Sequence, residues 1–398
     1  MDGRSQSWPT VLLIAGLCAL WAGCGSHQPV VCASPANSSL CTCGGGCPIQ
    51  AQPVLFATTT SDQILGFLIA PSGSLTAVAP VSGPANSQSI TGMNGAIYFA
   101  DSPNDQVAGE ESWSITSGTL SIAQGSPFSL GTGSGGPTSL LFDNYLNLYA
   151  TEPNGTIVGY STPGNGTVTA PLPASPYPAG VTPAQMALAL LNSGAALYAS
   201  DPGDSVGGIL AFSVNSDGSL SPISGSPFPT VAGASPSFLL QVTDFNENRF
   251  LFASLSNASR VASFSIDSST GALTPVPGSP FTVGNGPGTL ASVFVNQSGE
   301  LLVMNTLDHT VAAFTISSTG ALAPIGSPVP VGTASDGMAI YPDGDYVNGV
   351  TYGPVLYTAD TAASAIETVN VNSSTGAISP GTVVATSLPP VQLIQPAP

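Results

Sequence analysis

Acid–base chemistry in this chain would depend on very few side chains, of which Arg260, Asp308 and His309 are best placed. Arg260 lies four residues before Phe264, and His309 lies five residues before Phe314, the counterpart of Phe264 in the next repeat. We therefore expect Arg260 and His309 to open the third strands of neighbouring repeats, on the same rim. An arginine can stabilise an oxyanion, and a histidine beside a carboxylate can act as a general base. The alternative is that Asp308 and His309 form a solvated loop and that Arg260 pairs with local acids.

The loops on that rim also carry many carboxylates. A ring of acids with few bases gives one face a negative potential, which would attract Ca²⁺ or a cationic partner. The alternative is that these acids serve turn formation and solubility and bind no metal. The acids concerned are Asp101, Asp105, Glu110, Glu111, Glu152, Asp201, Asp204 and Asp360.

One segment copies the beginning of a calcium-binding loop. Asp244, Asn246 and Asn248 stand in the spacing D-x-N-x-N. A complete loop has glycine at position six and glutamate at position twelve, where this chain has Arg249 and Leu255. The sequence contains no P-loop and no H-E-x-x-H motif. We therefore expect no bound cofactor, with Ca²⁺ as the alternative.

The charge balance excludes several classes of partner. The chain has 3 Lys and Arg residues against 21 acids, and its formal net charge is -18. Proteins that bind nucleic acid neutralise phosphates with Lys and Arg, so nucleic-acid binding is excluded. A polybasic membrane-binding patch is excluded for the same reason. A phosphorylated substrate would also find few cations to hold it.

Residues 1–23 have the pattern of a signal peptide. They contain a 13-residue apolar run, which is too short to span a bilayer and has the length of a signal-peptide core. Ala22 and Gly23 precede Cys24 as in a bacterial lipobox, although Trp21 stands where that motif usually has an aliphatic residue. We expect Cys24 to carry lipid and to anchor an exported protein at the cell envelope, in the periplasm or at the outer membrane. Ordinary cleavage and an uncleaved anchor are the alternatives.

Residues 24–52 are expected to form a tether rich in cysteine and glycine. After Cys24 come Cys32, Cys41, Cys43 and Cys47, and the chain beyond has no cysteine. Outside the cytoplasm these four can form two disulfides, with three possible pairings. The alternative is a metal site, because the spacing C-x-C-x3-C can hold zinc.

Residues 53–398 repeat three elements in the same order seven times. A short apolar strand recurs at intervals of 43 to 54 residues, an alternating strand follows it, and a turn glycine then stands two positions before an aliphatic residue. One more aliphatic stretch, such as 289–295, completes each repeat. The first element appears as Leu55-Phe56-Ala57, Tyr98-Phe99-Ala100, Leu148-Tyr149-Ala150, Leu197-Tyr198-Ala199, Leu251-Phe252-Ala253, Leu302-Val303-Met304 and Leu356-Tyr357-Thr358.

Four strands in each of seven repeats predict an all-β fold, a seven-bladed β-propeller with four-stranded antiparallel blades. The body begins at the second strand of its first blade, so residues 390–395 should pair with residues 54–58 and close the ring. Four repeats also contain Gly-Ser-Pro, at 125–127, 225–227, 278–280 and 326–328. Because proline cannot donate to a central ladder, we expect this motif at an outer strand end or a loop.

The repeat x-F-S-I-x(2–3)-T/S-G-A-L-x-P-x-x-G-S-P-F, seen best at 212–228 and 264–281, resembles the lactonase-like family of seven-bladed propellers. That family includes phosphogluconolactonases and muconate-cycloisomerase relatives. The resemblance implies lactone hydrolysis as one activity, and with the expected signal peptide and Cys24 anchor the chain would be an exported lipoprotein member of the family. It covers the body of the chain, from residue 53 onward.

The residues themselves favour a different function. Opening a lactone needs an activated water and a stabilised oxyanion, and the body offers only Arg249, Arg260 and His309 as cationic or imidazole groups. We therefore expect a monomeric binding or scaffold module at the cell envelope, with a small molecule, a glycan or an envelope protein as partner. The alternative is an exported lactonase that hydrolyses a neutral or weakly charged lactone.

Overall fold

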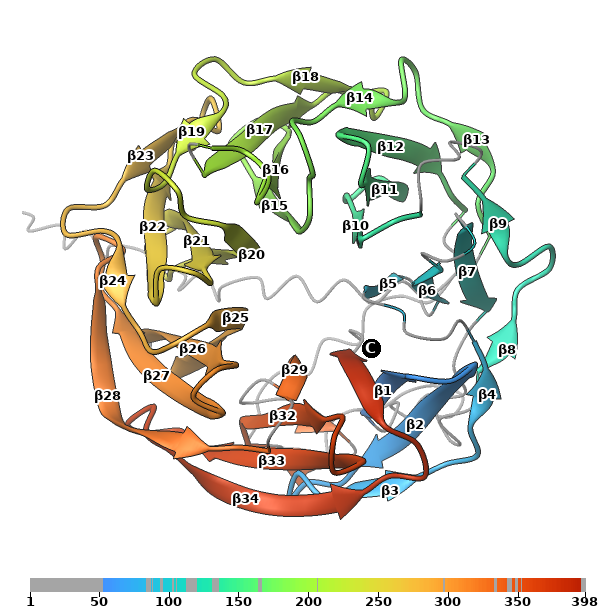
Figure 1. Ribbon diagram of the computed structural model, residues 1–398, viewed down its shortest axis with the longest axis vertical. Helices are drawn as coiled ribbons and strands as arrows, with labels where there is room; N and C mark the ends of the chain where they lie inside the picture. Colours follow the sequence, from blue (N-terminus) through green and yellow to red (C-terminus); the bar gives the residue numbers. More distant parts are fainter. Residues whose placement is uncertain are drawn as a thin grey trace, which may run out of the picture.

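The computed structural model describes residues 53–394 except 84–86, 88, 94–95, 102–103, 105, 112–119, 131–135, 164–166, 206, 296–297, 333–334, 342–345, 348–349 and 352. In this part of the chain, seven antiparallel sheets of four or five strands stand around a central axis (Figure 1). The predicted seven-bladed propeller is therefore confirmed. No helix among the described residues combines the length and the apolar character needed to cross a bilayer.

The blades follow one another along the chain, and each runs from the axis outward in strand order (Figure 1). Blade one contains β35 (Pro390–Ile394), β1 (Val54–Thr59), β2 (Gln63–Ile69), β3 (Leu75–Ala77) and the short β4 (Val81–Ser82). Blade two contains β5 (Ile90–Met93), β6 (Ala96–Asp101), β7 (Gln106–Glu111), β8 (Ser121–Ile122) and β9 (Phe128–Ser129). Blade three contains β10 (Ser139–Phe142), β11 (Asn147–Glu152), β12 (Thr156–Ser161), β13 (Ala170–Pro171) and β14 (Tyr177–Pro178).

The remaining blades repeat this plan. Blade four contains β15 (Met186–Leu190), β16 (Ala195–Ser200), β17 (Gly208–Val214), β18 (Leu220–Pro222) and β19 (Phe228–Pro229). Blade five contains β20 (Pro236–Thr243), β21 (Arg249–Leu255), β22 (Arg260–Ile266), β23 (Leu273–Pro275) and β24 (Phe281–Thr282). Blade six contains β25 (Pro287–Val295), β26 (Ser298–Asn305), β27 (Thr310–Ile316) and β28 (Leu322–Pro330). Blade seven contains β29 (Ser335–Tyr341), β32 (Val355–Asp360), β33 (Ala365–Val371) and β34 (Ile378–Ala385), with a small hairpin of β30 (Tyr346–Val347) and β31 (Val350–Thr351).

The second strand of each blade is the most deeply buried element. All six residues of β1, β6, β11, β16 and β32 are buried, because these strands have neighbours in their own sheet and a further blade against each face. The core is accordingly divided among the junctions between blades. At one junction, for example, Tyr198 of blade four packs in the same cluster as Leu251 of blade five. Burial of apolar side chains between sheets therefore stabilises the ring one junction at a time.

Buried hydroxyl groups link most blades to the next one. Three tyrosines of second strands donate to a main-chain carbonyl of the following blade, in the pairs Tyr98–Thr167, Tyr149–Gly218 and Tyr198–Gly271, at 3.3, 2.7 and 2.7 Å. In blade five the corresponding aromatic is Phe252, and the cross-strand neighbour Ser263 donates to Gly320 O at 2.8 Å instead. Tyr357 of blade seven donates to Gly73 O of blade one at 2.9 Å. The same kind of hydrogen bond therefore also joins the last blade to the first.

In blades two, four and five the Gly-Ser-Pro motif lies in a loop at the outer edge, as predicted, whereas in blade six residues 326–328 lie within the outer strand β28. A short strand follows this motif or its Ala-Ser-Pro variant in four blades, and it pairs with the first residues of the third strand. These short strands are β9, β14, β19 and β24. In blades three to five the motif serine accepts a hydrogen bond from a third-strand N–H, in the pairs Gly159–Ser175, Ala211–Ser226 and Ser263–Ser279. The serine hydroxyl thus replaces a ladder acceptor where the outer strand is interrupted.

The C-terminal strand closes the ring, as predicted. In β35, Ile394 lies opposite Phe56 of β1, and Leu393 lies opposite Ala57. The N–H of Gln392 also donates to the hydroxyl of Thr58 at 3.0 Å. Because β35 supplies the inner strand of blade one, the edge of β1 that faces the axis is paired.

The structure corrects the alignment of two repeats by one residue. In blade two, Tyr98 lies opposite Gly109 as Tyr149 lies opposite Gly159, so Tyr98 is the counterpart of Tyr149 rather than of Leu148. In blade six, Leu301 lies opposite Phe314 as Leu251 lies opposite Phe264. Similar apolar letters at adjacent positions make the motif ambiguous, and the cross-strand partner settles the register.

Candidate functional site

Arg260 and His309 lie at the beginning of third strands in neighbouring blades, as expected from their spacing. Arg260 is the first residue of β22 and is exposed, while His309 directly precedes β27 and is half-buried. Strands β20 and β21 separate β22 from the axis (Figure 1). The two residues therefore lie on the rim and not in the wall of the central channel, which the innermost strands form.

His309 occupies a special position in its turn. Its φ is 52°, in the left-handed region, where Ser259 and Ser364 occupy the matching positions of blades five and seven with φ of 55° and 51°. The imidazole atom Nδ1 is buried and has no hydrogen-bond partner among the described residues. Asp308 therefore does not orient this ring through Nδ1.

The carboxylate of Asp308 binds the connection between blades five and six. Its Oδ2 accepts the backbone N–H of Asn285, and its Oδ1 accepts the side-chain amide of Asn285, both at 2.8 Å. Asn285 in turn accepts a hydrogen bond from the hydroxyl of Ser259 at 3.1 Å. These bonds from Asn285, and to a smaller extent the charge of His309, lower the pKa of Asp308. Asp308 is thus an acceptor that holds a loop, and the catalytic role of the three residues stays a prediction.

Several of the rim acids serve the same purpose. Asp101, Glu152, Asp201 and Asp360 are buried at the ends of second strands. Asp201 accepts the N–H groups of Val181 and Thr182, in the connection from blade three, at 2.8 and 2.9 Å. Asp101 accepts the amide of Asn104, Asp204 accepts the N–H of Gly208, and Asp360 accepts the N–H of Ala363. The carboxylates of Asp101, Asp201, Asp204 and Asp360 thus stabilise turns and connections. Asp105 and the side chains of Glu110 and Glu111 lie outside the described residues.

The segment that resembles a calcium loop is an Asx turn. Asp244 Oδ1 accepts the N–H groups of Asn246 and Asn248, both at 2.8 Å. Asp143 Oδ1 accepts the N–H groups of Tyr145 and Asn147 in the same way. The D-x-N-x-N spacing is therefore explained by a repeated hairpin turn. Within the described part of the chain, no group of three or more His, Cys, Asp or Glu residues could hold a metal ion.

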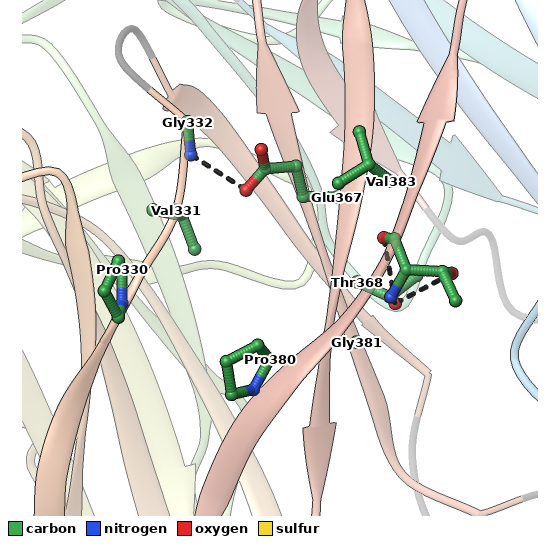
Figure 2. A pocket seen from close by; sticks show the side chains of 9 residues that line it. Pro330, Val331, Gly332, Glu367, Thr368, Pro380, Gly381 and Val383 are labelled. Carbon is green, nitrogen blue, oxygen red and sulfur yellow. Dashed lines mark hydrogen bonds between the residues drawn. The ribbon is translucent and has the colours of Figure 1, made fainter.

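The sequence analysis missed a carboxylate that lines a pocket between blades six and seven. The cavity measures about 300 Å³, and Figure 2 shows Glu367 pointing toward Gly332, whose N–H donates to Glu367 Oε2 at 2.8 Å. A signal was available, because the third strands of the other blades have an apolar residue at this position. We call this cavity the Glu367 pocket; its lining residues are Pro330, Val331, Gly332, Glu367, Thr368, Pro380, Gly381, Thr382 and Val383.

Solved structures share this architecture over most of the chain, whereas no protein-family model and no curated protein matches it. A candidate 6-phosphogluconolactonase from Bacteroides fragilis is 16% identical, with a TM-score of 0.68 over 88% of this chain and 99% of that one. Another from Bacteroides uniformis is 17% identical, with a TM-score of 0.69 over 87% and 99%. The periplasmic gluconolactonase of Pseudomonas aeruginosa is also 17% identical, with a TM-score of 0.65 over 87% and 99%.

The chain has the lactonase-like propeller fold. The resemblance that the repeats predicted is thus confirmed at the level of the fold. At these identities the likeness extends to the fold alone, so the activity of this lactonase-like propeller must be argued from its own residues. The predicted lipid site Cys24 and the cysteines of the tether, Cys32, Cys41, Cys43 and Cys47, lie outside the described residues.

Proposed function

We propose that this lactonase-like propeller is an exported, lipid-anchored binding module and not an enzyme. The observation that supports this proposal is the use of the rim carboxylates. Asp308 and Asp201 each accept two hydrogen bonds from the connection that enters their blade. A carboxylate held in this way is a poor general base, because protonation would break bonds that hold the loop.

The chemistry of the partner follows from the charge of the chain. A net charge of -18 repels anions, so a neutral or cationic partner is favoured over a phosphorylated or polycarboxylate one. Neutral small molecules, glycans and envelope proteins with basic surfaces satisfy this condition. The rim of blades five and six, where Leu307 is 73% exposed, is the surface we propose for contact.

A second candidate function is hydrolysis of a neutral or weakly charged lactone. Two observations favour it, the shared fold with the gluconolactonase of Pseudomonas aeruginosa and the exposed side chain of Arg260, whose neighbour Ser259 is linked through Asn285 to Asp308. In this alternative, Arg260 would stabilise the oxyanion and His309 would activate water, with Asp308 beside it.

A lactonase assay separates the two functions. We expect the purified full chain to show no turnover with a panel of neutral and acidic lactones. Turnover that falls about 10²- to 10⁴-fold in His309→Ala would establish the alternative, since a positioned acid–base group contributes that much. Turnover that survives both His309→Ala and Arg260→Ala would establish an enzyme with a different site.

Cell fractionation tests the anchor separately. The wild type should sediment with membranes, and Cys24→Ser should move to the soluble fraction, because several acyl chains give a stable anchor that the variant cannot receive. Cys18→Ser, within the predicted signal peptide, is the matched control and should leave the distribution unchanged. A Cys24→Ser protein that stays with membranes would contradict the lipid anchor.

A further inference from the structure

Beyond the proposed function, we propose that the Glu367 pocket binds a primary ammonium group carried on a short apolar stem. The pocket lies between blades six and seven, among residues of β28, β33 and β34 and the connection after β28. Its volume of about 300 Å³ is at the lower end of the range for small-molecule sites, roughly 300–1,000 Å³.

Glu367 stands at a position where each of the remaining blades has an apolar cross-strand pair. Glu367 of β33 lies opposite Thr358 of β32, and on the same face Leu356 and Val369 pack in one cluster with Val311 of blade six. This position therefore faces the preceding blade, where an uncompensated charge is unfavourable. The corresponding pairs are Ala57–Leu65, Phe99–Ala108, Ala150–Val158, Ala199–Leu210, Ala253–Ala262 and Val303–Ala312.

No lysine or arginine of the described chain compensates Glu367. The sequence contains no lysine, and Arg249 and Arg260 lie in blade five. The third arginine, Arg4, lies outside the described residues. Among those residues Glu367 forms no ion pair, and Gly332 N–H is its one hydrogen-bond donor. A cation from outside, drawn by the net charge of -18, would supply the missing partner.

The polar atoms of the pocket favour ammonium over guanidinium. Gly332 N–H takes one acceptor position of Glu367 Oε2, so Oε1 is the oxygen without a donor among the described residues. A guanidinium binds a carboxylate best through both oxygens, whereas an ammonium is a point donor. Thr368 offers little competition, because its hydroxyl is bound to Thr382 and accepts the N–H of that residue at 2.6 Å.

The rest of the site suits the stem of such a ligand. Pro330, Val331, Pro380 and Val383 give the pocket apolar walls, which would cover an alkyl chain and strengthen an ion pair by excluding water. Beside Glu367, the hydroxyl of Thr358 is buried without a hydrogen-bond partner among the described residues. A half-buried carboxylate without a cation and a buried hydroxyl without a partner among the described residues thus lie on one face, where a bound ligand would complete both.

Titration of the ¹⁵N-labelled full chain with n-butylammonium chloride tests the proposal. We expect saturable shifts of the amide signals of Gly332 and Gly381 and at least about tenfold weaker binding by Glu367→Gln. n-Butanol and n-butylguanidinium should bind at least tenfold more weakly than n-butylammonium. N-acetyl-lysine amide forms a second arm: binding comparable to the free amine would identify lysine side chains as ligands, and binding of the amine alone would identify small amines.

Asp62→Asn is the matched control, because it removes one exposed carboxylate in blade one and should bind like the wild type. Equal binding by wild type and Glu367→Gln, equal losses in Glu367→Gln and Asp62→Asn, or no saturable shift in the wild type would each overturn the proposal. Melting curves identify a Glu367→Gln protein that has failed to fold. In that case, the location of the shifts in the wild type decides the question.

Discussion

Two neighbouring junctions of the ring are built from the same secondary structure but with different side chains. At the junction between blades seven and one, Tyr357 donates to Gly73 O, and apolar residues such as Leu55 and Ile366 share one cluster. At the junction between blades six and seven, Leu302 occupies the place of the tyrosine, and Glu300, Thr358 and Glu367 bring polar atoms between the sheets. The fold therefore tolerates polar groups at one junction when the others are well packed.

Glu300 shows how the junction between blades six and seven differs. Its side chain lies under Gly376 of blade seven, where Phe250 lies under Gly320 at the preceding junction. Glu300 as a residue is 2% exposed, and its Oε2 has no hydrogen-bond partner among the described residues. Burial raises the pKa of Glu300 to about 7, although hydrogen bonds from Val295 and Ser298 lower it.

The largest effect should come from opening the junction between blades seven and one. Removal of residues 389–398 deletes β35, in which Val391 and Leu393 are buried, and leaves the inner edge of β1 unpaired. We expect a loss of at least about 4 kcal/mol in the free energy of unfolding, from two lost apolar side chains, measured as a fall in the midpoint of thermal unfolding. Removal of residues 396–398 is the control, and an unchanged midpoint in the longer deletion would contradict ring closure by β35.

Glu300→Gln should stabilise the protein above neutral pH. The pKa of Glu300 is about 7 in the folded protein and near 4.5 in the unfolded chain, so the folded state binds more protons between these values. Stability should therefore fall as pH rises from about 4.5 to 7, by as much as ~3 kcal/mol, and Gln should abolish this fall. Chemical unfolding at pH 4 and pH 8 measures it. The exposed residue substitution Glu247→Gln should keep the wild-type pH dependence.

Tyr357→Phe should remove the tyrosine hydrogen bond between blades seven and one, which has no counterpart between blades six and seven. The change leaves Gly73 O without its donor, and we expect a loss of about 1–2 kcal/mol, measured by urea unfolding. Tyr145, which is 70% exposed, provides the control Tyr145→Phe with no expected effect. Equal stability of Tyr357→Phe and wild type would show that packing alone holds this junction.

Thr358→Val should have the smallest effect and the opposite sign. The hydroxyl of Thr358 is buried without a partner among the described residues, and valine has the same shape without the polar atom. We expect a gain of roughly 1 kcal/mol in the free energy of unfolding. The exposed Thr60 gives the control Thr60→Val, which should be neutral. A destabilised Thr358→Val protein would mean that a bound water or ligand uses the hydroxyl.

The fold could be predicted because it is repeated, and the site could not because it is assembled from distant segments. Seven copies of the same strand and turn signals average out local ambiguity, although the register of Tyr98 and Leu302 still slipped by one residue. The binding of Asp308 to Asn285 joins residues 23 positions apart through a connection without a motif. Glu367 was recognisable only by its cross-strand pair, because a glutamate in an alternating strand reads as a solvent-facing residue.

The closing strand also determines the order in which the chain can fold. The bond between Gln392 and Thr58 joins residues 334 positions apart, and lengthening a loop from about 50 to about 330 residues adds only about 1.6 kcal/mol of closure entropy. Closure is therefore a minor term at equilibrium but a late event in time, because contacts of such separation form slowly. Until the last residues are available, β1 keeps an open edge that other chains could pair with. The first blade along the sequence is thus the last one to be completed.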